Sequence, residues 1–407
     1  MRKSPLLVRL AVVAAWTERS IADGSEASQA VDSVDCDCYL TNGSVPTYYS
    51  QRMFFDFRNL AEFAGVPDTL DDVPDSIHAS PSSEYFETDS WTSVWELQTW
   101  DNRKGVGELS HGDTVLMVNS PNNVYLEEND DDDDEDAGPE TFMTMRTARL
   151  PEFQTAAEFQ STQSYHYVSL RMLARTIGDP GAVTAMFTYR HSEELADVQE
   201  ADIEFLTNGP RDRIQYTNQP SYTLEGDEFP EAARNASVPG DVEWTRWMVH
   251  RLDWTPDECV WYVDGEETAR ISYQTPLDPA QIIFNAWSDG GAWSGNMSVH
   301  DAAYLQIQWI EMVFNTTGDD DGSTKRSDAG RSPGRPGRLV WRDHEEDEGG
   351  CGHVCSIDER DEVGSVTMLS ESSAPSCRVW VSHLSSSGVI RILLVCAVWF
   401  SLLDWLI

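Results

Sequence analysis

The chain has 407 residues, of which 70 are acidic and 28 are Lys or Arg, so its formal net charge is -42. So acidic a chain argues against nucleic acid or anionic lipid as a partner and fits a neutral or cationic substrate. The length is sufficient for one large β domain with tails, or for two domains.

Residues 1–22 have the layout of a secretory signal peptide. Arg2 and Lys3 precede a short apolar run, Leu6–Trp16, which Arg9 interrupts. An ordinary N-terminal helix is the alternative. Asn-x-Ser/Thr sequons also favour a secreted protein, and they begin at Asn42, Asn235, Asn296 and Asn315.

The chain has 7 cysteines: Cys36, Cys38, Cys259, Cys351, Cys355, Cys377 and Cys396. Cys396 lies in an apolar tail, and without it the number is even, which suits an oxidising compartment. The pairing stays open. Cys351-x3-Cys355 resembles half of a zinc site, but no second half with ligand spacing follows. We therefore expect no metal and no cofactor.

Residues 36–126 are expected to be β structure rich in aromatic side chains. These are either core residues or platforms for sugar rings: Phe54, Phe55, Phe57, Trp91, Trp95 and Trp100. The acidic run at 127–137 cannot pack and predicts a solvated loop or a disordered insertion. A calcium site is the alternative, but the run lacks the glycine and the alternation of a calcium loop.

Short strands with frequent turns follow. We expect them at Thr141–Thr147, Tyr165–Ala174, Ala182–Tyr189, Arg213–Thr217, Trp247–Trp254, Val260–Val263, Gln281–Trp287 and Tyr304–Phe314. Asp264-Gly265 is a two-residue hairpin turn. Many short strands of this kind indicate an all-β sandwich or barrel.

The segment 198–206 is the most informative of these strands. As a strand it places Glu200, Asp202 and Glu204 on one face and apolar residues on the other. Three like charges repel one another, so folding alone does not favour them. They suit glycoside hydrolysis, in which one carboxylate attacks the sugar and another transfers a proton. A solvated acidic strand is the alternative.

After Thr317 the composition changes. Residues 318–388 are expected to form a linker that includes a small Cys-containing segment at 351–377. Residues 389–407 end the chain with an apolar run that is short for a bilayer span. A Ser-rich spacer before a terminal apolar tail is typical of a lipid-anchor signal, and a plain membrane helix is the alternative.

The segments that follow one another along 36–317 resemble the fungal members of glycoside hydrolase family 16. They are Gln199–Leu206, Tyr216–Pro220, Leu252–Asp257, Trp261–Gly265, Ile282–Ser288, Trp293–Gly295 and Trp309–Glu311. This combination is more specific than the acidic strand alone. The acidic run and the Arg-rich part of the linker depart from the family pattern. We assign residues 23–317 to the family domain.

The resemblance implies an all-β fold, a concanavalin A-like β-jelly roll of two antiparallel sheets with a substrate cleft. It implies retaining, endo-acting cleavage of β-1,3- or β-1,3/1,4-glucan, with Glu200 as nucleophile, Glu204 as acid/base and Asp202 between them. Transfer between glucan or chitin chains remains an alternative. A lectin-like wall protein without activity is another.

Four further residues are candidates for substrate contact: Trp287, Trp293, Asn285 and Tyr216. Indole rings stack on sugar rings, although core packing is the alternative for each tryptophan. His250 is expected in the core or on the surface. The expected partner is a polysaccharide, with no nucleic acid. We expect a monomer, secreted to the cell surface or cell wall and attached to the membrane through its C-terminal segment.

Overall fold

The computed structural model describes residues 36–44, 46–105, 108–109, 112–129, 139–315, 351–359 and 362–371. The expected signal peptide, most of the acidic run, the stretch 318–350 and the apolar tail lie outside the described residues. Within the described part, no helix has the length and apolar character needed to cross a bilayer.

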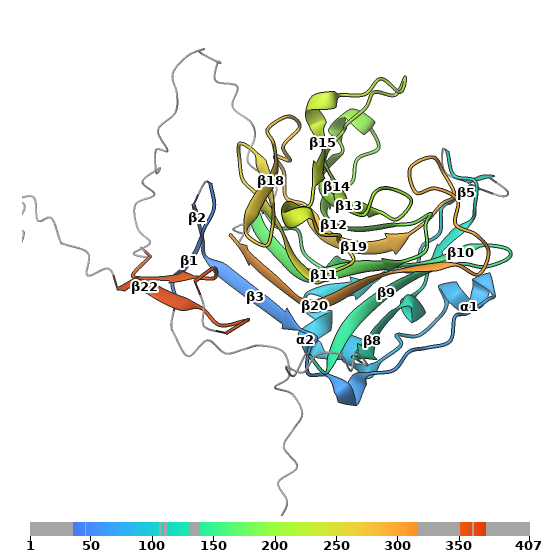
Figure 1. The fold of residues 1–407 in the computed structure, drawn as a ribbon, viewed down its shortest axis with the longest axis horizontal. Coiled ribbons are helices and arrows are strands. Elements are labelled where there is room, and N and C mark those ends of the chain that lie inside the picture. The colour runs from blue at the N-terminus through green and yellow to red at the C-terminus, as the bar shows by residue number, and fades with distance from the viewer. Residues whose placement is uncertain are drawn as a thin grey trace, which may run out of the picture.

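The first sheet of the sandwich runs in the order β15-β14-β13-β12-β19-β10-β4, with every neighbouring pair antiparallel (Figure 1). Its strands are β4 Trp95–Leu97, β10 Gln154–Ser161, β12 Val183–Arg190, β13 Gln199–Leu206, β14 Arg213–Gln219, β15 Ala233–Ser237 and β19 Gln281–Trp287. This sheet carries the acidic strand, β13, near its middle.

The second sheet runs β9-β20-β11-β16-β17-β18, with β3 beside β20 and β8 beside β9. Its strands are β3 Gln51–Asp56, β8 Val124–Glu128, β9 Thr141–Arg149, β11 Val168–Gly178, β16 Met248–Trp254, β17 Cys259–Val263, β18 Glu266–Ile271 and β20 Ala302–Phe314. The start of β10 pairs with β9 and the rest of it with β19, so β10 joins the two sheets.

Short elements complete the sandwich. They are strands β5 Arg103–Gly105, β6 Glu108–Leu109 and β7 Met117–Asn119, and helices α1 Val73–Ile77 and α2 Asp89–Thr92. Single 3-10 turns lie at Ala61–Phe63, Glu84–Glu87, Pro121–Asn123, Leu195–Asp197, Pro230–Ala232 and Pro239–Asp241. β7 runs parallel to β10 and pairs with the first part of that strand.

One large apolar core fills the space between the sheets. Ala201, Ile203 and Phe205 enter it from β13, and Trp91 and Trp95 are almost fully buried in it. His250 is buried there as well, with its ring 4.8 Å from that of Phe205. The expected all-β sandwich of two mainly antiparallel sheets is thereby confirmed.

Residues 36–126, expected to be β structure, also contain helices α1 and α2. The strands expected after them are present with small changes at their ends, but β15 was not expected, and neither was β10. Its central residues alternate as Ala157-Glu158-Phe159-Gln160, the same apolar and polar pattern that identified β13. Ala157 and Phe159 enter the core, whereas Glu158 and Gln160 lie on the other face. A search for strict alternation would have found this strand.

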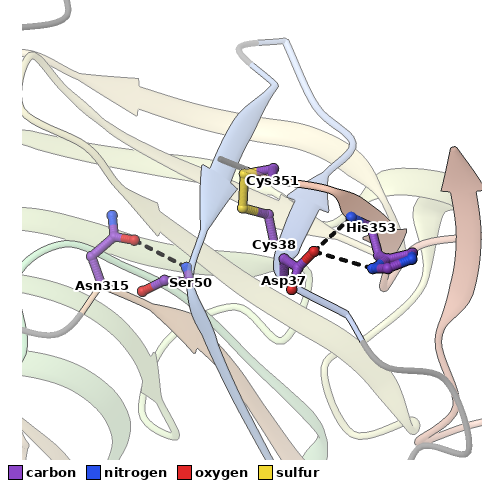
Figure 2. Close-up of a disulfide and its surroundings, with 6 residues drawn as sticks. All are labelled: Asp37, Cys38, Ser50, Asn315, Cys351 and His353. Atoms are coloured by element: carbon purple, nitrogen blue, oxygen red, sulfur yellow. Dashed lines mark hydrogen bonds and ion pairs between the residues drawn. A yellow bond between two sulfur atoms is a disulfide. The ribbon is translucent and has the colours of Figure 1, made fainter. Parts of the chain in front are cut away.

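A third, small sheet joins the two ends of the described chain. Its order is β2-β1-β21-β22, with β1 Cys38–Thr41, β2 Thr47–Tyr49, β21 His353–Ser356 and β22 Thr367–Glu371. Disulfides link Cys36 to Cys355 and Cys38 to Cys351. Next to them, the Asp37 carboxylate accepts a hydrogen bond from the His353 backbone N at 2.8 Å (Figure 2). We call this sheet with its disulfides the terminal clamp.

The terminal clamp packs against the sandwich rather than standing apart from it. Asp358 pairs with Arg171 of β11 at 2.7 Å, and both side chains are largely buried. Ile357 packs on Tyr49 and on Val313 of β20. The clamp therefore lies against the second sheet, away from β13 (Figure 1). Cys259 is a buried free thiol, and Cys377 lies outside the described residues.

The clamp predicts the outcome of cutting the chain between 318 and 350. With one specific protease site inserted there, the two pieces should stay joined on a non-reducing denaturing gel and separate after reduction, because two disulfides span the cut. The control is a chain with Cys36→Ser and Cys38→Ser, which should give two bands without reduction. Two bands from the unaltered, non-reduced chain would contradict the pairing.

Candidate active site

Three carboxyl side chains stand in a row on β13. Glu200, Asp202 and Glu204 alternate with the core residues of the strand, so all three lie on the face of the first sheet that points away from the core. We call this the carboxyl face. Asp202 is 3% exposed, and the two glutamates are half-buried.

Strand register aligns further residues with Glu204. It pairs with Ala185 of β12, and Ala185 pairs with Asn285 of β19. Asn285 in turn pairs with Glu158 of β10. On the other side, Glu204 pairs with Gln215 of β14. Directly opposed residues share a face of the sheet, so these side chains form one line across the strands, which we call the Glu204 row.

The carboxyl groups hold protons more strongly than free carboxylic acids do. Burial and the charge of Glu204 together raise the pKa of Glu200 to about 8. Burial raises the pKa of Glu204 to about 7, and the pKa of Asp202 lies well above its ordinary value through burial and the two neighbouring glutamates. A row of three buried like charges is costly, so the site keeps protons near neutral pH.

The hydrogen bonds indicate where the protons reside. The bond between Asp202 and Glu200 raises the pKa of Asp202 and lowers that of Glu200. Asp202 is therefore the protonated donor and Glu200 the acceptor. Glu204 accepts a hydrogen bond from Trp293 Nε1 at 3.2 Å, which lowers its pKa.

The loop that carries Trp293 is held by close backbone packing. Asp289 Oδ1 accepts from the backbone N of Gly291 at 2.8 Å and from Ser294 Oγ at 2.5 Å. Gly295 has a φ of +82°, and a Cβ there would meet the Asn208 side chain at 2.6 Å. Only glycine fits such a position. This packing sets the indole of Trp293 beside the acidic strand.

A pocket of about 240 Å³ opens on the same face, toward β10. Its lining residues are Trp100, Asn102, Asp113, Met117, Asn119, Glu158, Asn285, Trp287 and Asp289. Trp100 donates its Nε1–H to Glu158 Oε1 at 2.7 Å while its ring stays 43% exposed. Burial raises the pKa of Glu158, and the bonds from Trp100 and Asn285 oppose that shift.

Two oxygens of the pocket have no hydrogen-bond partner among the residues that the structure describes. They are Oδ1 of Asn119 and Oδ1 of Asn285, both buried. Buried acceptors are nearly always satisfied in folded proteins. A ligand with several hydroxyl groups would satisfy both and could stack on the exposed indole of Trp100.

The expected site residues fall into two groups. The structure brings Trp293 to Glu204 and places Asn285 and Trp287 in the pocket. Tyr216 is a correction, because it does not reach the carboxyl face. It pairs with Ile203 rather than with a carboxyl residue, is 1% exposed, and its ring packs 5.5 Å from that of Trp261 in the core.

Glu158 and Trp100 were not expected at the site. Glu158 belongs to the strand that sequence reasoning missed, and its alternation with Ala157 and Phe159 was the available signal. Trp100 was one of several aromatic residues of undecided role. Its neighbours Trp91 and Trp95 pack in the core, whereas Trp100 lines the pocket. Sequence spacing does not distinguish these environments.

Nothing in the described ranges gathers three or more His, Cys, Asp or Glu side chains in a metal-binding arrangement. Cys351 and Cys355, which resemble half of a zinc site, are both bound in disulfides.

Comparison with known proteins places these features in a family context. Residues 119–311 match the family model of glycosyl hydrolases family 16. A β-glucanase of Paenibacillus polymyxa is 26% identical over 160 residues, 39% of this chain and 64% of that enzyme. The Crh-like protein UTR2 of Candida albicans is 26% identical over 213 residues, 44% of this chain and 42% of that protein. The chain thus spans less than two thirds of either relative.

Parts of this chain are also similar to solved structures. A β-1,3-1,4-glucanase (lichenase) derived from a mouse hindgut metagenome is 17% identical, with a TM-score of 0.43 over 65% of this chain and 99% of that one. A β-glucanase of Bacillus licheniformis is 20% identical, with a TM-score of 0.42 over 55% of this chain and 92% of that one.

The carboxyl row should make the protein less stable as the pH rises. The pKa of Asp202 is higher in the folded protein than its ordinary 3.8, so the fold is favoured below that pH and weakened above it. Asp202→Asn should therefore increase the free energy of unfolding at pH 7 by about 1–3 kcal/mol. Denaturant unfolding between pH 4 and 8 measures this.

The matched control for this change is Asp227→Asn, at an exposed loop residue, which should leave stability unchanged. The pH dependence of unfolding should be shallower in Asp202→Asn than in the control. If Asp202→Asn instead loses stability at pH 7, Asp202 is an ionised, well-paired carboxylate and not the protonated donor.

Proposed function

We propose, from the premise that residues 119–311 carry a glycosyl hydrolase family 16 domain, that this chain cleaves internal bonds of a β-1,3- or β-1,3/1,4-glucan with retention of configuration. One observation carries the proposal: Glu200, Asp202 and Glu204 stand in a row on the face that also holds the pocket. A binding protein has no use for three buried carboxyl groups that repel one another.

In the first step the Glu200 carboxylate attacks the anomeric carbon of the sugar. Glu204 gives its proton to the glycosidic oxygen as the bond from that oxygen to the anomeric carbon breaks. The leaving sugar departs as an alcohol, and the remaining chain is bound to Glu200 as an ester. In the second step Glu204 takes a proton from water, whose oxygen replaces Glu200 at the anomeric carbon.

The raised pKa of Glu204 supports its role as the acid. A general acid needs a proton near working pH, which a pKa of about 7 for Glu204 provides. Asp202 stabilises the charge of Glu200 by donating to it. The anomeric carbon becomes positive in the transition state, and the negative charge of the Glu200 carboxylate stabilises it. The row is thus costly in the free protein and matched to the transition state.

We assign the pocket to the part of the chain that stays on the enzyme between the two steps. That part must be held while the leaving sugar is exchanged for water, and the pocket offers buried acceptors and an exposed indole for it. The opposite end of the Glu204 row, over β14 and β15, is then left to the leaving sugars.

A second candidate is transfer of the glycosyl group to another sugar instead of water. The Crh-like protein of Candida albicans, similar over 44% of this chain, supports keeping this candidate. The chemistry at Glu200 is the same in both cases, and only the acceptor of the second step differs.

We also propose that the chain is secreted and that its C-terminal apolar segment, residues 389–407, is removed and replaced by a lipid that holds the chain at the cell surface. The two disulfides need an oxidising compartment, and the asparagines of all four sequons are exposed. Mass spectrometry of the mature termini tests this proposal. An intact end at Ile407 would contradict removal of the tail.

Product analysis tests the main proposal. The secreted protein should release oligosaccharides from laminarin or from mixed-linkage glucan, and the new reducing ends should first appear in the β configuration. Adding a labelled acceptor sugar separates the two candidates, because a transferase puts the label into long products. Activity on chitin alone would replace the glucan assignment. Binding to all of these polymers without turnover would favour the lectin-like alternative.

Substitution of either glutamate should impair the reaction, each in a different way. Glu200→Gly and Glu204→Ala should each lower glucan turnover by about a thousandfold or more. Glu200→Gly should use an α-glycosyl fluoride with an acceptor sugar, because the fluoride fills the place of the ester. Glu204→Ala should still attack a dinitrophenyl glycoside, and azide should speed its second step and give a β-azide.

The matched control is Glu266→Gln, at an exposed glutamate of β18 in the other sheet, which should keep full activity. If azide rescues the Glu200 change on the aryl donor and not the Glu204 change, with a β-azide product, the two roles are reversed. If neither change affects turnover, the row on β13 is not the site.

A further inference from the structure

Asn235 lies on β15, the edge strand of the first sheet, within the sequence Asn-Ala-Ser. Its side chain is exposed, and its Nδ2 donates to Gln215 Oε1 at 3.3 Å. Asn235 pairs with Gln215, and Gln215 pairs with Glu204. Asn235 therefore ends the Glu204 row and belongs to the carboxyl face.

The Glu204 row gives the position of Asn235 relative to a bound chain. The row starts at Glu158 in the pocket, passes Asn285, Ala185 and Glu204, and ends at Gln215 and Asn235. Strands lie about 4.8 Å apart, so the Cα of Asn235 is about 10 Å from that of Glu204. A sugar chain that leads from the pocket over Glu204 continues toward Asn235 at the β15 side of the sheet (Figure 1).

The other three sequons occupy different surroundings. Asn42 follows β1 in the terminal clamp, and Asn315 follows β20 with its Oδ1 accepting from the backbone N of Ser50 at 3.1 Å (Figure 2). Asn296 lies in the segment between β19 and β20. Among the four asparagines, Asn235 alone is in register with Glu204.

We propose that Asn235 carries an N-linked glycan that limits how many sugar units fit on the β15 end of the carboxyl face. This rests on the proposed function and on the proposed secretion. The amide nitrogen forms a bond to the anomeric carbon of an oligosaccharide donor, and the bond from that carbon to a lipid diphosphate breaks. One amide proton leaves with the diphosphate product. The other N–H remains and can still donate to Gln215.

The position of the glycan determines its effect. The distance of about 10 Å between the Cα atoms of Glu204 and Asn235 leaves room for the first leaving or accepting sugars. A longer chain continues into the space that the glycan occupies. The glycan should therefore hinder long leaving or accepting chains and have little effect on a donor with a small leaving group, which does not extend past Glu204.

The experiment uses the full chain secreted from a eukaryotic host that performs N-glycosylation. Glycopeptide mass spectrometry measures occupancy at Asn235. Ser237→Ala removes the sequon and leaves Asn235 with its bond to Gln215. Asn42→Gln is the matched control, because it removes a sequon in the terminal clamp. Each protein is assayed for kcat/KM on long glucan and on a dinitrophenyl oligosaccharide, and for binding of short and long glucan oligosaccharides.

Asn235 should be glycosylated in the unaltered chain. Ser237→Ala should raise kcat/KM on long glucan roughly fivefold or more, the size of one or two hydrogen bonds to sugar, and leave the aryl donor within about twofold. Asn42→Gln should change neither. An empty Asn235, or an unchanged ratio of long glucan to aryl donor, overturns the inference while the proposed function stands. A glycosylated chain that turns over neither donor overturns the proposed function. If Ser237→Ala then also binds long oligosaccharides no better than the unaltered chain does, the inference is overturned too.

Discussion

The alternation of apolar and acidic residues along β13 is the constraint on which the site depends. Ala201, Ile203 and Phe205 are buried between the sheets, and their burial forces Glu200, Asp202 and Glu204 onto the opposite face. The repulsion within the row is tolerated because the core side of the same strand is firmly packed. Burial raises the pKa values of all three acids, so they hold protons more strongly than free carboxylic acids do.

The rest of the site comes from segments far apart in the chain. Trp293 reaches Glu204 from a loop 89 residues further on, and that loop is held by the close approach of Gly295 to Asn208. Glu158 reaches the carboxyl face from β10, the strand that joins the two sheets. Each of these contacts depends on the antiparallel order of the strands, so the site is a property of the whole sandwich.

The terminal clamp lies apart from the carboxyl row. It packs on the second sheet, with Asp358 against Arg171 and Ile357 against Val313, while the carboxyl row lies on the outer face of the first sheet. Two disulfides with sequence separations of 319 and 313 hold it there. The clamp therefore packs on a different sheet from the one that bears the carboxyl face.

The sequence by itself determined the fold class, the acidic strand and the residues Glu200, Asp202 and Glu204, because alternation is local and is written in consecutive residues. The sequence also offered Asn285, Trp287, Trp293 and Tyr216 as candidates for substrate contact. Only the tertiary structure decided that Tyr216 faces the core, that Trp100 and Glu158 line the pocket, and that Cys36 and Cys38 pair with Cys355 and Cys351. Such choices depend on strand register and on which distant segments pack together, and neither is encoded in the spacing of neighbouring residues.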